Sequence, residues 1–220
     1  MSLYPEARFI TSAARAAQFV PDQGREVAFA GRSNAGKSSA INAILNRRDF
    51  ARTSKTPGRT QLINFFALDD ARRLVDLPGY GYARVAKEMR DHWRELLDDY
   101  FHARDSLTGL FLIVDSRRGL GDIDWQMLEW AHALDGPIHV LLTKADKLSR
   151  REATETLAKG QAELGPDVTV QLFSATKKLG LDATRSERDI EPVLIWVAAV
   201  ATAMSAIVQS SVSPERCDTI

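Results

Sequence analysis

A run of eight residues near the start of the chain could bind the phosphates of a nucleotide. Gly31 to Ser38 read G-R-S-N-A-G-K-S and meet the pattern G-x-x-x-x-G-K-[ST]. In this pattern backbone N–H groups surround the phosphates, Lys37 reaches the β- and γ-phosphates, and the Ser38 hydroxyl binds Mg²⁺. A glycine turn that merely precedes a helix is the alternative. The run predicts a nucleoside triphosphate site with magnesium.

Two motifs at predicted strand ends indicate which nucleotide binds. Asp76 opens D-L-P-G, where a carboxylate can hold Mg²⁺ from its outer shell and the backbone N–H of Gly79 can approach a γ-phosphate. Thr143 to Asp146 read T-K-A-D, and an ionised Asp146 accepts two hydrogen bonds from guanine, which adenine cannot supply. Taken alone, the first motif could be a simple turn, and the second a solvent-facing lysine beside a helix-capping aspartate. Together they favour a guanine nucleotide.

Strands and helices must position these motifs. Apolar runs predict strands over 26–30, 61–68, 73–76, 109–115, 138–143 and 168–173. Helical spacing predicts helices over 38–45, 85–103, 124–134 and 150–164. The alternation indicates a doubly wound three-layer α/β fold, with an antiparallel hairpin around Asp69–Asp70 at the sheet edge. Each motif then falls at the carboxyl end of a strand, where ligands bind in such sheets.

Composition sets further limits. A chain of 220 residues suits one large α/β domain, and 29 basic residues balance 29 acidic ones, so net charge gives no sign of nucleic acid. Basic residues do gather over 47–59, although a solvated loop is the ordinary explanation. The single cysteine, Cys217, excludes an internal disulfide and a cysteine zinc cluster within one chain. The N-terminus lacks a signal-peptide pattern, so we expect a cytoplasmic protein.

Five segments resemble the EngB (YihA-type) family of bacterial ribosome-biogenesis GTP-binding proteins, among the TrmE-Era-EngA-EngB-like GTPases. They are GRSNAGKSS, TPGRTQ, DLPGYGYA, TKADK and FSATKK, and the resemblance covers roughly residues 26–182. It implies a P-loop GTPase G domain with a mostly parallel six-stranded sheet, one antiparallel edge strand and helices on both faces. It also implies hydrolysis of GTP to GDP and phosphate at a low intrinsic rate, a role in assembly of the large ribosomal subunit, and a link to cell division and septation.

The resemblance also implies the site residues. It places Mg²⁺ on Ser38, Thr60 and Asp76, and it gives Asn34, Lys37, Thr60 and Gly79 roles in hydrolysis. The positions implied to bind GTP or GDP are Gly31, Arg32, Ser33, Asn34, Ala35, Gly36, Lys37, Ser38, Gly58, Arg59, Thr60, Gln61, Leu62, Asp76, Leu77, Pro78, Gly79, Thr143, Lys144, Ala145, Asp146, Phe173, Ser174 and Ala175.

Three residues bear on the rate of hydrolysis. Thr60 could complete the Mg²⁺ shell only with a γ-phosphate present, which would make its loop a switch; a threonine favoured for β-structure is the alternative. Tyr80 stands where many GTPases place the glutamine that orients the attacking water, so we expect slow turnover. Asn34 either holds K⁺, as in similar K⁺-activated GTPases, or tolerates an unusual backbone conformation.

Two classes of partner stay open. In the first, the protein is a monomer that binds the large-subunit precursor and its rRNA. In the second, it recruits cell-division proteins without touching RNA. Basic residues favour the first, because RNA affinity rests heavily on neutralising phosphates. T-K-A-D disfavours a third class, a metabolic P-loop kinase, and no stable membrane association is expected. The basic residues are Arg47, Arg48, Arg52, Lys55, Arg59, Arg84, Lys87, Arg90, Arg117 and Arg118.

The ends of the chain complete the predicted domain organisation. Residues 1–24 form an N-terminal extension, 25–182 form the G domain, and 183–220 form an atypical apolar segment. Where the family continues into a charged amphipathic helix, residues 192–214 contain no charge. We favour a displaced final helix packed on the G domain; a weak membrane anchor, a partner-binding segment and a reading-frame change are the alternatives.

Overall fold

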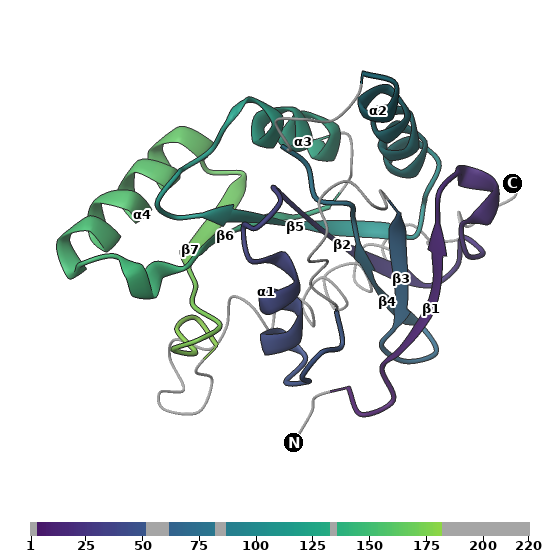
Figure 1. Ribbon diagram of the computed structural model, residues 1–220, viewed down its shortest axis with the longest axis horizontal. Helices are drawn as coiled ribbons and strands as arrows, with labels where there is room; N and C mark the ends of the chain where they lie inside the picture. The colour runs from purple at the N-terminus through teal and green to yellow at the C-terminus, as the bar shows by residue number, and fades with distance from the viewer. Residues whose placement is uncertain (1–3, 52–61, 82–86, 133–135, 182–220) are drawn as a thin grey trace, which may run out of the picture. The chain divides into compact units, whose positions relative to one another are not determined.

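The fold is described from a computed structural model, for residues 4–51, 62–81, 87–132 and 136–181 (Figure 1). These residues belong to one compact unit, Met1–Asp182. The strands are β1 (Arg8–Ala13), β2 (Arg25–Gly31), β3 (Ile63–Ala67), β4 (Arg72–Asp76), β5 (Leu107–Asp115), β6 (Ile138–Thr143) and β7 (Val168–Leu172). The helices are α1 (Lys37–Ile44), α2 (Lys87–His102), α3 (Asp122–His132) and α4 (Arg150–Leu164), with 3₁₀ turns η1 (Ala16–Gln18) and η2 (Ala145–Lys147).

The strands form one sheet in the order β1-β3-β4-β2-β5-β6-β7. Parallel pairing joins β4 to β2, β2 to β5, β5 to β6 and β6 to β7. Antiparallel pairing is confined to one edge, where β3 pairs with both β1 and β4. The predicted P-loop GTPase fold is therefore confirmed, including the hairpin formed by β3 and β4.

One strand was not predicted. The described residues form seven strands rather than six, because the N-terminal extension adds β1 beside β3. The Ser12 hydroxyl donates to Asn64 Oδ1 at 2.6 Å, and the rings of Phe9 and Phe66 meet edge to face. Most side chains of β1 are exposed or half-buried, and the strand has a register shift between Phe9 and Thr11. A short, largely exposed edge strand lacks the apolar run from which the other strands were predicted.

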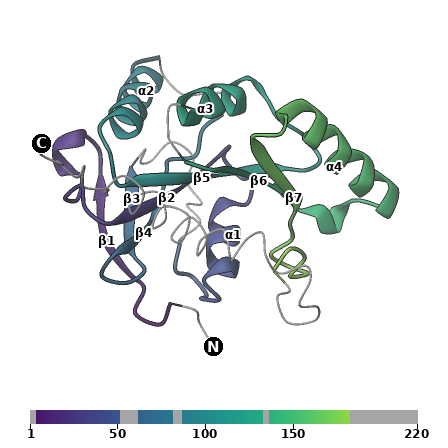
Figure 2. The same cartoon turned by 180° about the vertical axis from the view of Figure 1, so that it is seen from behind.

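Helices cover both faces of the sheet. In Figure 1, α2 and α3 lie on one face and α1 lies on the other, and the reverse view in Figure 2 shows the same layers. Leu97 of α2 and Met127 of α3 are buried in one core cluster with Leu112 of β5 and Val140 of β6. Burial of one such side chain contributes about 1.5–3 kcal/mol, so this cluster holds α2 and α3 against one face of the sheet.

A buried ion cluster fixes the amino end of β2. Glu26 is fully buried, and its carboxylate accepts hydrogen bonds from Arg104 at 2.5 and 2.9 Å, Arg73 at 3.1 Å and the Tyr100 hydroxyl at 3.2 Å. Arg104 also donates to the Val20 carbonyl at 2.9 Å. Multiple hydrogen bonds to both charges offset the cost of their burial. The cluster therefore ties the N-terminal extension and the segment after α2 to the strand that leads to the predicted phosphate loop.

The ends of α4 agree with their prediction. Ser149 accepts a hydrogen bond from the Glu152 backbone and the Glu152 side chain accepts one from the Ser149 backbone, a complete capping box.

Within the described part of the chain, no helix is both long enough and apolar enough to span a bilayer. Residues 183–220 lie outside the described residues, so the predicted domain division and the placement of the apolar segment stay predictions.

We predict that His139 makes stability fall between pH 6.5 and 4. This β6 side chain is 1% exposed, and desolvation lowers its pKa to about 4 from 6.5. The unfolded chain therefore takes up a proton below pH 6.5 while the folded protein stays neutral, so acid favours unfolding. The full effect is about 3 kcal/mol. Urea unfolding at pH 7.5, 6.5, 5.5 and 4.5 measures it.

The control is His139→Phe, which cannot titrate and keeps a ring against Phe111, now 5.4 Å away. We expect this variant to lose most of the pH dependence above pH 4.5. Parallel stability profiles for the two proteins would show that another group causes the loss.

Candidate nucleotide-binding site

The predicted phosphate loop joins β2 to α1 at the centre of the sheet. Gly36 is the N-cap of α1 with φ +108°, a conformation that glycine adopts without the strain that a side chain would introduce. No side chain caps the first turn of this helix among the described residues. Its N-terminal N–H groups and the positive end of its dipole thus suit an anion. Strand, loop and helix therefore follow one another as predicted.

The residues predicted for phosphate and for magnesium meet at this loop. Asp76 ends β4, and the parallel register places it beside Phe29 of β2. Its carboxylate forms an ion pair with the Lys37 ammonium, and both side chains are largely buried. Ser38 follows Lys37 in the first turn of α1. The structure therefore brings a phosphate-binding lysine, a hydroxyl and a carboxylate to one place.

This donor set fits Mg²⁺ that is shared with a nucleotide. Among the described residues, no three His, Cys, Asp or Glu side chains gather into a metal site. Mg²⁺ commonly uses one or two protein oxygens together with substrate phosphates and water. Ser38 and Asp76 supply such oxygens at the phosphate loop, whereas Thr60, the third predicted ligand, lies outside the described residues.

The D-L-P-G segment lies directly against the phosphate loop. The Ser33 N–H donates to the Tyr80 carbonyl at 2.7 Å, and Arg32 and Tyr80 form an isolated parallel bridge beyond the ends of β2 and β4. A Cβ at Gly79 would stand 3.5 Å from the Ser33 Cα. The backbone of Gly79 is thus where the sequence predicted it, next to the phosphate-binding residues.

Tyr80 points into the protein and not toward the predicted nucleotide. Its side chain is 3% exposed, its hydroxyl donates to Asp124 Oδ1 at 2.6 Å, and its ring lies 5.7 Å from that of Trp93. Desolvation raises the pKa of both Tyr80 and Asp124. The Tyr80 side chain is therefore held away from the place of an attacking water. Sequence reasoning did not predict this role for Asp124.

Thr143 and Lys144 bind the phosphate loop itself. The Thr143 hydroxyl contacts the Ala35 carbonyl and lies 3.0 Å from that of Val114. The Lys144 ammonium donates to the Asn34 carbonyl at 2.6 Å and to Asp115 Oδ2 at 2.8 Å. Lys144 is thus partly exposed, but its ammonium is bound to two groups of the protein and does not simply face solvent. Asp115 was not predicted, although it ends an apolar strand as Asp76 does.

The carboxylate of Asp146, the predicted acceptor for guanine, is held by two neighbouring side chains. The Ser174 hydroxyl donates to its Oδ1 at 2.7 Å, and Lys147 Nζ lies 3.1 Å from its Oδ2. The hydrogen bond from Ser174 is the main cause that lowers the pKa of Asp146. Its carboxylate is thus ionised at neutral pH. The Ala145 N–H donates to the Phe173 carbonyl at 3.1 Å, which joins the T-K-A-D segment to the predicted residues 173–175.

Asn34 has the left-handed backbone conformation that asparagine tolerates, with φ +63°. This observation agrees with the interpretation that asparagine tolerates an unusual backbone conformation, whereas binding of K⁺ stays a prediction.

Residues 58–61, predicted to bind nucleotide, lie outside the described residues. Leu62 is described as half-buried and precedes β3. The remaining predicted positions all lie at the carboxyl ends of β2, β4, β6 and β7 or at the start of α1.

Comparison with known proteins agrees with this geometry. Residues 26–144 match the model of the family described as 50S ribosome-binding GTPase. A protein of Coxiella burnetii (strain CbuK_Q154) named "Probable GTP-binding protein EngB" is 52% identical over 186 residues, which cover 83% of this chain and 91% of that protein. The chain belongs to the EngB family. Another EngB relative, from Coxiella burnetii strain RSA 493, has the same identity and coverage.

Solved structures resemble the EngB chain less closely in sequence. A crystal structure of a GTP-binding protein engB matches with a TM-score of 0.54 and 25% identity, covering 69% of this chain and 90% of that one. Era in complex with MgGDPNP and nucleotides 1506–1542 of 16S ribosomal RNA matches with a TM-score of 0.53 and 19% identity. It covers 71% of this chain and 53% of Era, and it supports the fold alone. As an EngB family member, the chain is a GTPase that binds GTP and GDP.

We predict that Asp146→Asn changes base recognition. The asparagine amide presents a donor where guanine also has donors, so GDP affinity should fall at least about 100-fold. Affinity for xanthosine diphosphate should rise, because xanthine has a carbonyl where guanine has its 2-amino group. Titration with fluorescent nucleotide analogues measures both affinities.

The matched control is Lys147→Ala, which removes the other contact of Asp146 and leaves its carboxylate. This lysine is 61% exposed, so we expect GDP affinity to change less than about threefold. Equal GDP affinities for Asp146→Asn and the unaltered protein would show that guanine binds elsewhere.

Proposed function

We propose that this chain is a slow, cytoplasmic GTPase that acts as a switch in assembly of the large ribosomal subunit, and that cell division and septation depend on it. The match of residues 26–144 to the 50S ribosome-binding GTPase family carries the proposal. The geometry supports it, because Thr143 and Lys144 join the base-recognition segment to the phosphate loop. A rigid link of this kind suits a protein whose surface must depend on its nucleotide.

Ribosomal RNA of the large-subunit precursor is the partner that we propose, with the protein acting as a monomer. Of the predicted basic residues, Arg48, Arg117 and Arg118 are exposed. Arg47 is partly engaged, with its guanidinium 5.0 Å from the centre of the Phe50 ring. Exposed arginines bind phosphate strongly, and their contacts weaken with salt. The alternative is recruitment of cell-division proteins without RNA, and it would not require binding that weakens with salt.

The chemistry of the site supports slow hydrolysis. Ser38 and Asp76 would hold Mg²⁺, which neutralises developing charge on the phosphates when bound. Lys37 lies at the same point and would orient the β- and γ-phosphates. The Tyr80 side chain is fixed by Asp124 and is not available to orient water. Turnover should therefore be on the order of 10⁻³ s⁻¹ or slower without a partner.

Sedimentation tests the partner. Cell extract supplemented with the protein and a non-hydrolysable GTP analogue is separated on sucrose gradients at low salt, and the same extract with GDP is compared. We expect the protein to travel with large-subunit particles in the GTP-analogue sample only, because the γ-phosphate favours the binding-competent state.

Asp146→Asn is the control for this experiment. It should stay at the top of the gradient at guanine-nucleotide concentrations that load the unaltered protein. If the unaltered protein also stays free of particles with both nucleotides, the alternative function without RNA contact is favoured.

The role of Asn34 is tested by cation dependence. If its side chain holds K⁺ near the phosphates, GTP hydrolysis should be at least about tenfold faster in KCl than in NaCl. Asn34→Gly is the matched variant, since glycine keeps the backbone conformation with φ near +63° and removes the side chain. We expect this variant to lose the K⁺ effect. Equal rates for the unaltered protein in both salts would leave Asn34 with its backbone role alone.

A further inference from the structure

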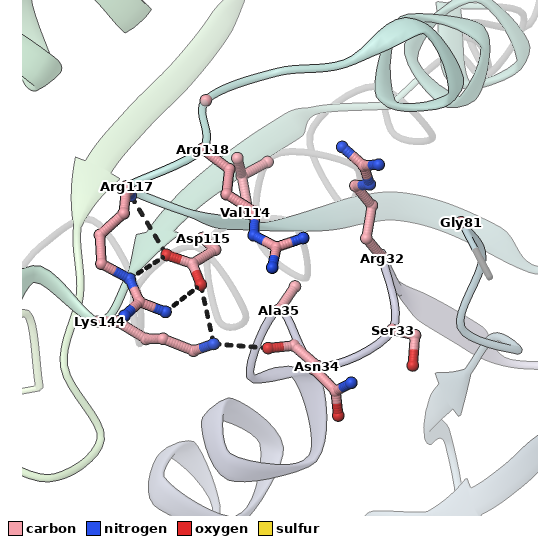
Figure 3. A pocket seen from close by; sticks show the side chains of 11 residues that line it. Arg32, Ser33, Asn34, Ala35, Gly81, Val114, Asp115, Arg117, Arg118 and Lys144 are labelled. Atoms are coloured by element: carbon pink, nitrogen blue, oxygen red, sulfur yellow. Dashed lines mark hydrogen bonds and ion pairs between the residues drawn. The ribbon is translucent and has the colours of Figure 1, made fainter. Parts of the chain in front are cut away.

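A cationic pocket with a volume of about 200 Å³ lies beside the phosphate loop. It is bounded by the phosphate loop, Gly81, the end of β5, the segment after β5 and Lys144. In Figure 3 the Arg118 guanidinium lies in the middle of this pocket, with Arg117 and Lys144 on one side and Arg32 on the other. Four cationic side chains thus surround a small space.

This pocket is distinct from the phosphate cradle. Its lining includes Arg32, Ser33, Asn34 and Ala35 from the first half of the loop, but none of Lys37, Ser38 or Asp76. Of the base-recognition segments it includes Lys144, but neither residue 146 nor residue 174. The pocket is therefore lined by the first half of the loop, whereas the residues predicted to bind phosphate and magnesium lie in its second half and at the end of β4.

Four cationic side chains and one carboxylate line the pocket, and a second carboxylate, that of Asp124, lies beside it near Arg32. Asp115 is the one carboxylate among its lining residues, and its oxygens are already bound by Arg117 at 2.7 and 2.9 Å and by Lys144 at 2.8 Å. These hydrogen bonds keep the pKa of Asp115 well below its usual range, Arg117 first among them. Within the described residues, no carboxylate forms an ion pair with Arg118. The exposed guanidinium of Arg118 therefore carries charge that Asp115 does not neutralise.

Arg32 is positioned by two glycines. A Cβ at Gly121 would stand 2.9 Å from Arg32 Nη1, and a Cβ at Gly81 would stand 3.1 Å from Arg32 Nε. The absence of these side chains leaves a slot through which Arg32 reaches the pocket. Gly81 follows Tyr80, so the slot belongs partly to the segment that starts with D-L-P-G. Arg32 is thus held between the phosphate loop, this segment and the start of α3.

The size and charge of the pocket select a phosphate group. Pockets for whole small molecules usually measure about 300–1,000 Å³, so about 200 Å³ suits a single group. Each guanidinium group can donate two hydrogen bonds to two oxygens of a phosphate. Two guanidinium groups from different segments therefore fit a tetrahedral phosphate as a ligand better than they fit a planar carboxylate. An opening to solvent, seen at the exposed Arg118, allows that group to belong to a large molecule.

We propose that Arg32 and Arg118 bind a backbone phosphate of ribosomal RNA at this pocket. This inference rests on the proposed function, and it names the point of contact. A phosphate there would lie against Asn34 and Ala35, whose carbonyls are held by Lys144 and Thr143. RNA and nucleotide would then contact neighbouring parts of the same loop.

The test is binding of in-vitro-transcribed large-subunit ribosomal RNA to the full chain loaded with a non-hydrolysable GTP analogue. Filter binding across 50–200 mM KCl gives the affinity and the slope of log K against log salt. For Arg118→Ala we expect a loss of about tenfold in affinity and a slope that is smaller by about 0.7–0.9, the value for one phosphate contact. Arg118→Lys should keep most of the slope while losing affinity, because it keeps the charge without the fork.

The matched control is Arg151→Ala, which removes the same charge from an exposed position on α4, where Arg151 pairs with Glu155. It should leave both affinity and slope unchanged. GDP affinity should be unchanged in Arg118→Ala, because Arg118 is outside the cradle, and this shows that the variant is folded.

Three outcomes would overturn the proposal. If Arg118→Ala binds RNA with unchanged affinity and slope while the unaltered protein binds well, the contact at this pocket fails and the proposed function stands. If the unaltered protein binds no ribosomal RNA even at 50 mM salt, both the contact and the RNA partner fail. If inorganic phosphate raises the melting temperature of the unaltered protein but not of Arg118→Ala, and RNA affinity does not depend on Arg118, the pocket takes free anions only.

Discussion

The arrangement of the site depends on the hydrogen bonds that Thr143 and Lys144 donate to the phosphate loop. Their hydroxyl and ammonium groups bind the carbonyls of Ala35 and Asn34. The C=O and N–H of one peptide unit point in opposite directions, so the hold on the Ala35 carbonyl also sets the direction of the Gly36 N–H. The Ala35 N–H, which shares a peptide unit with the Asn34 carbonyl, donates to the Arg32 carbonyl at 3.0 Å. The segment that is predicted to read the base thus also shapes the predicted phosphate loop, and Asp115 in turn accepts a hydrogen bond from Lys144.

Much of this site was readable in the sequence because its parts are local. Two kinds of local pattern predicted it: a glycine loop between a strand and a helix, and an acidic residue at the end of an apolar strand. The chemistry of each pattern can be recognised from a few consecutive residues. The bounds of α4 were equally local, since Ser149 and Glu152 form its capping box. Because neighbouring strands pair in parallel, Asp76 and Asp146 lie at the same edge of the sheet, where the strands have their carboxyl ends. No additional sequence motif was needed to predict this.

The features that were missed are those that depend on partners far away in the sequence. The buried carboxylate of Asp124 accepts a hydrogen bond from the Tyr80 hydroxyl, which is 44 residues away in the sequence, and this contact is not visible from α3 alone. Strand β1 shows no apolar run, because β3 supplies the pairing and most of its own side chains face solvent. A single sequence records which residues can pair, whereas burial of a polar group follows only from the folded arrangement.

The position of β1 has a consequence for the order in which the sheet is completed. During synthesis this strand emerges first, yet its contact between Ser12 and Asn64 spans 52 residues. Until β3 has been made, the strand has no neighbour in the sheet, and closing so long a loop is slow compared with forming a helix. The pairing of β1 must therefore wait until β3 has been made, so in a nascent chain that pauses before residue 63 the backbone groups of β1 have no partner strand in the sheet.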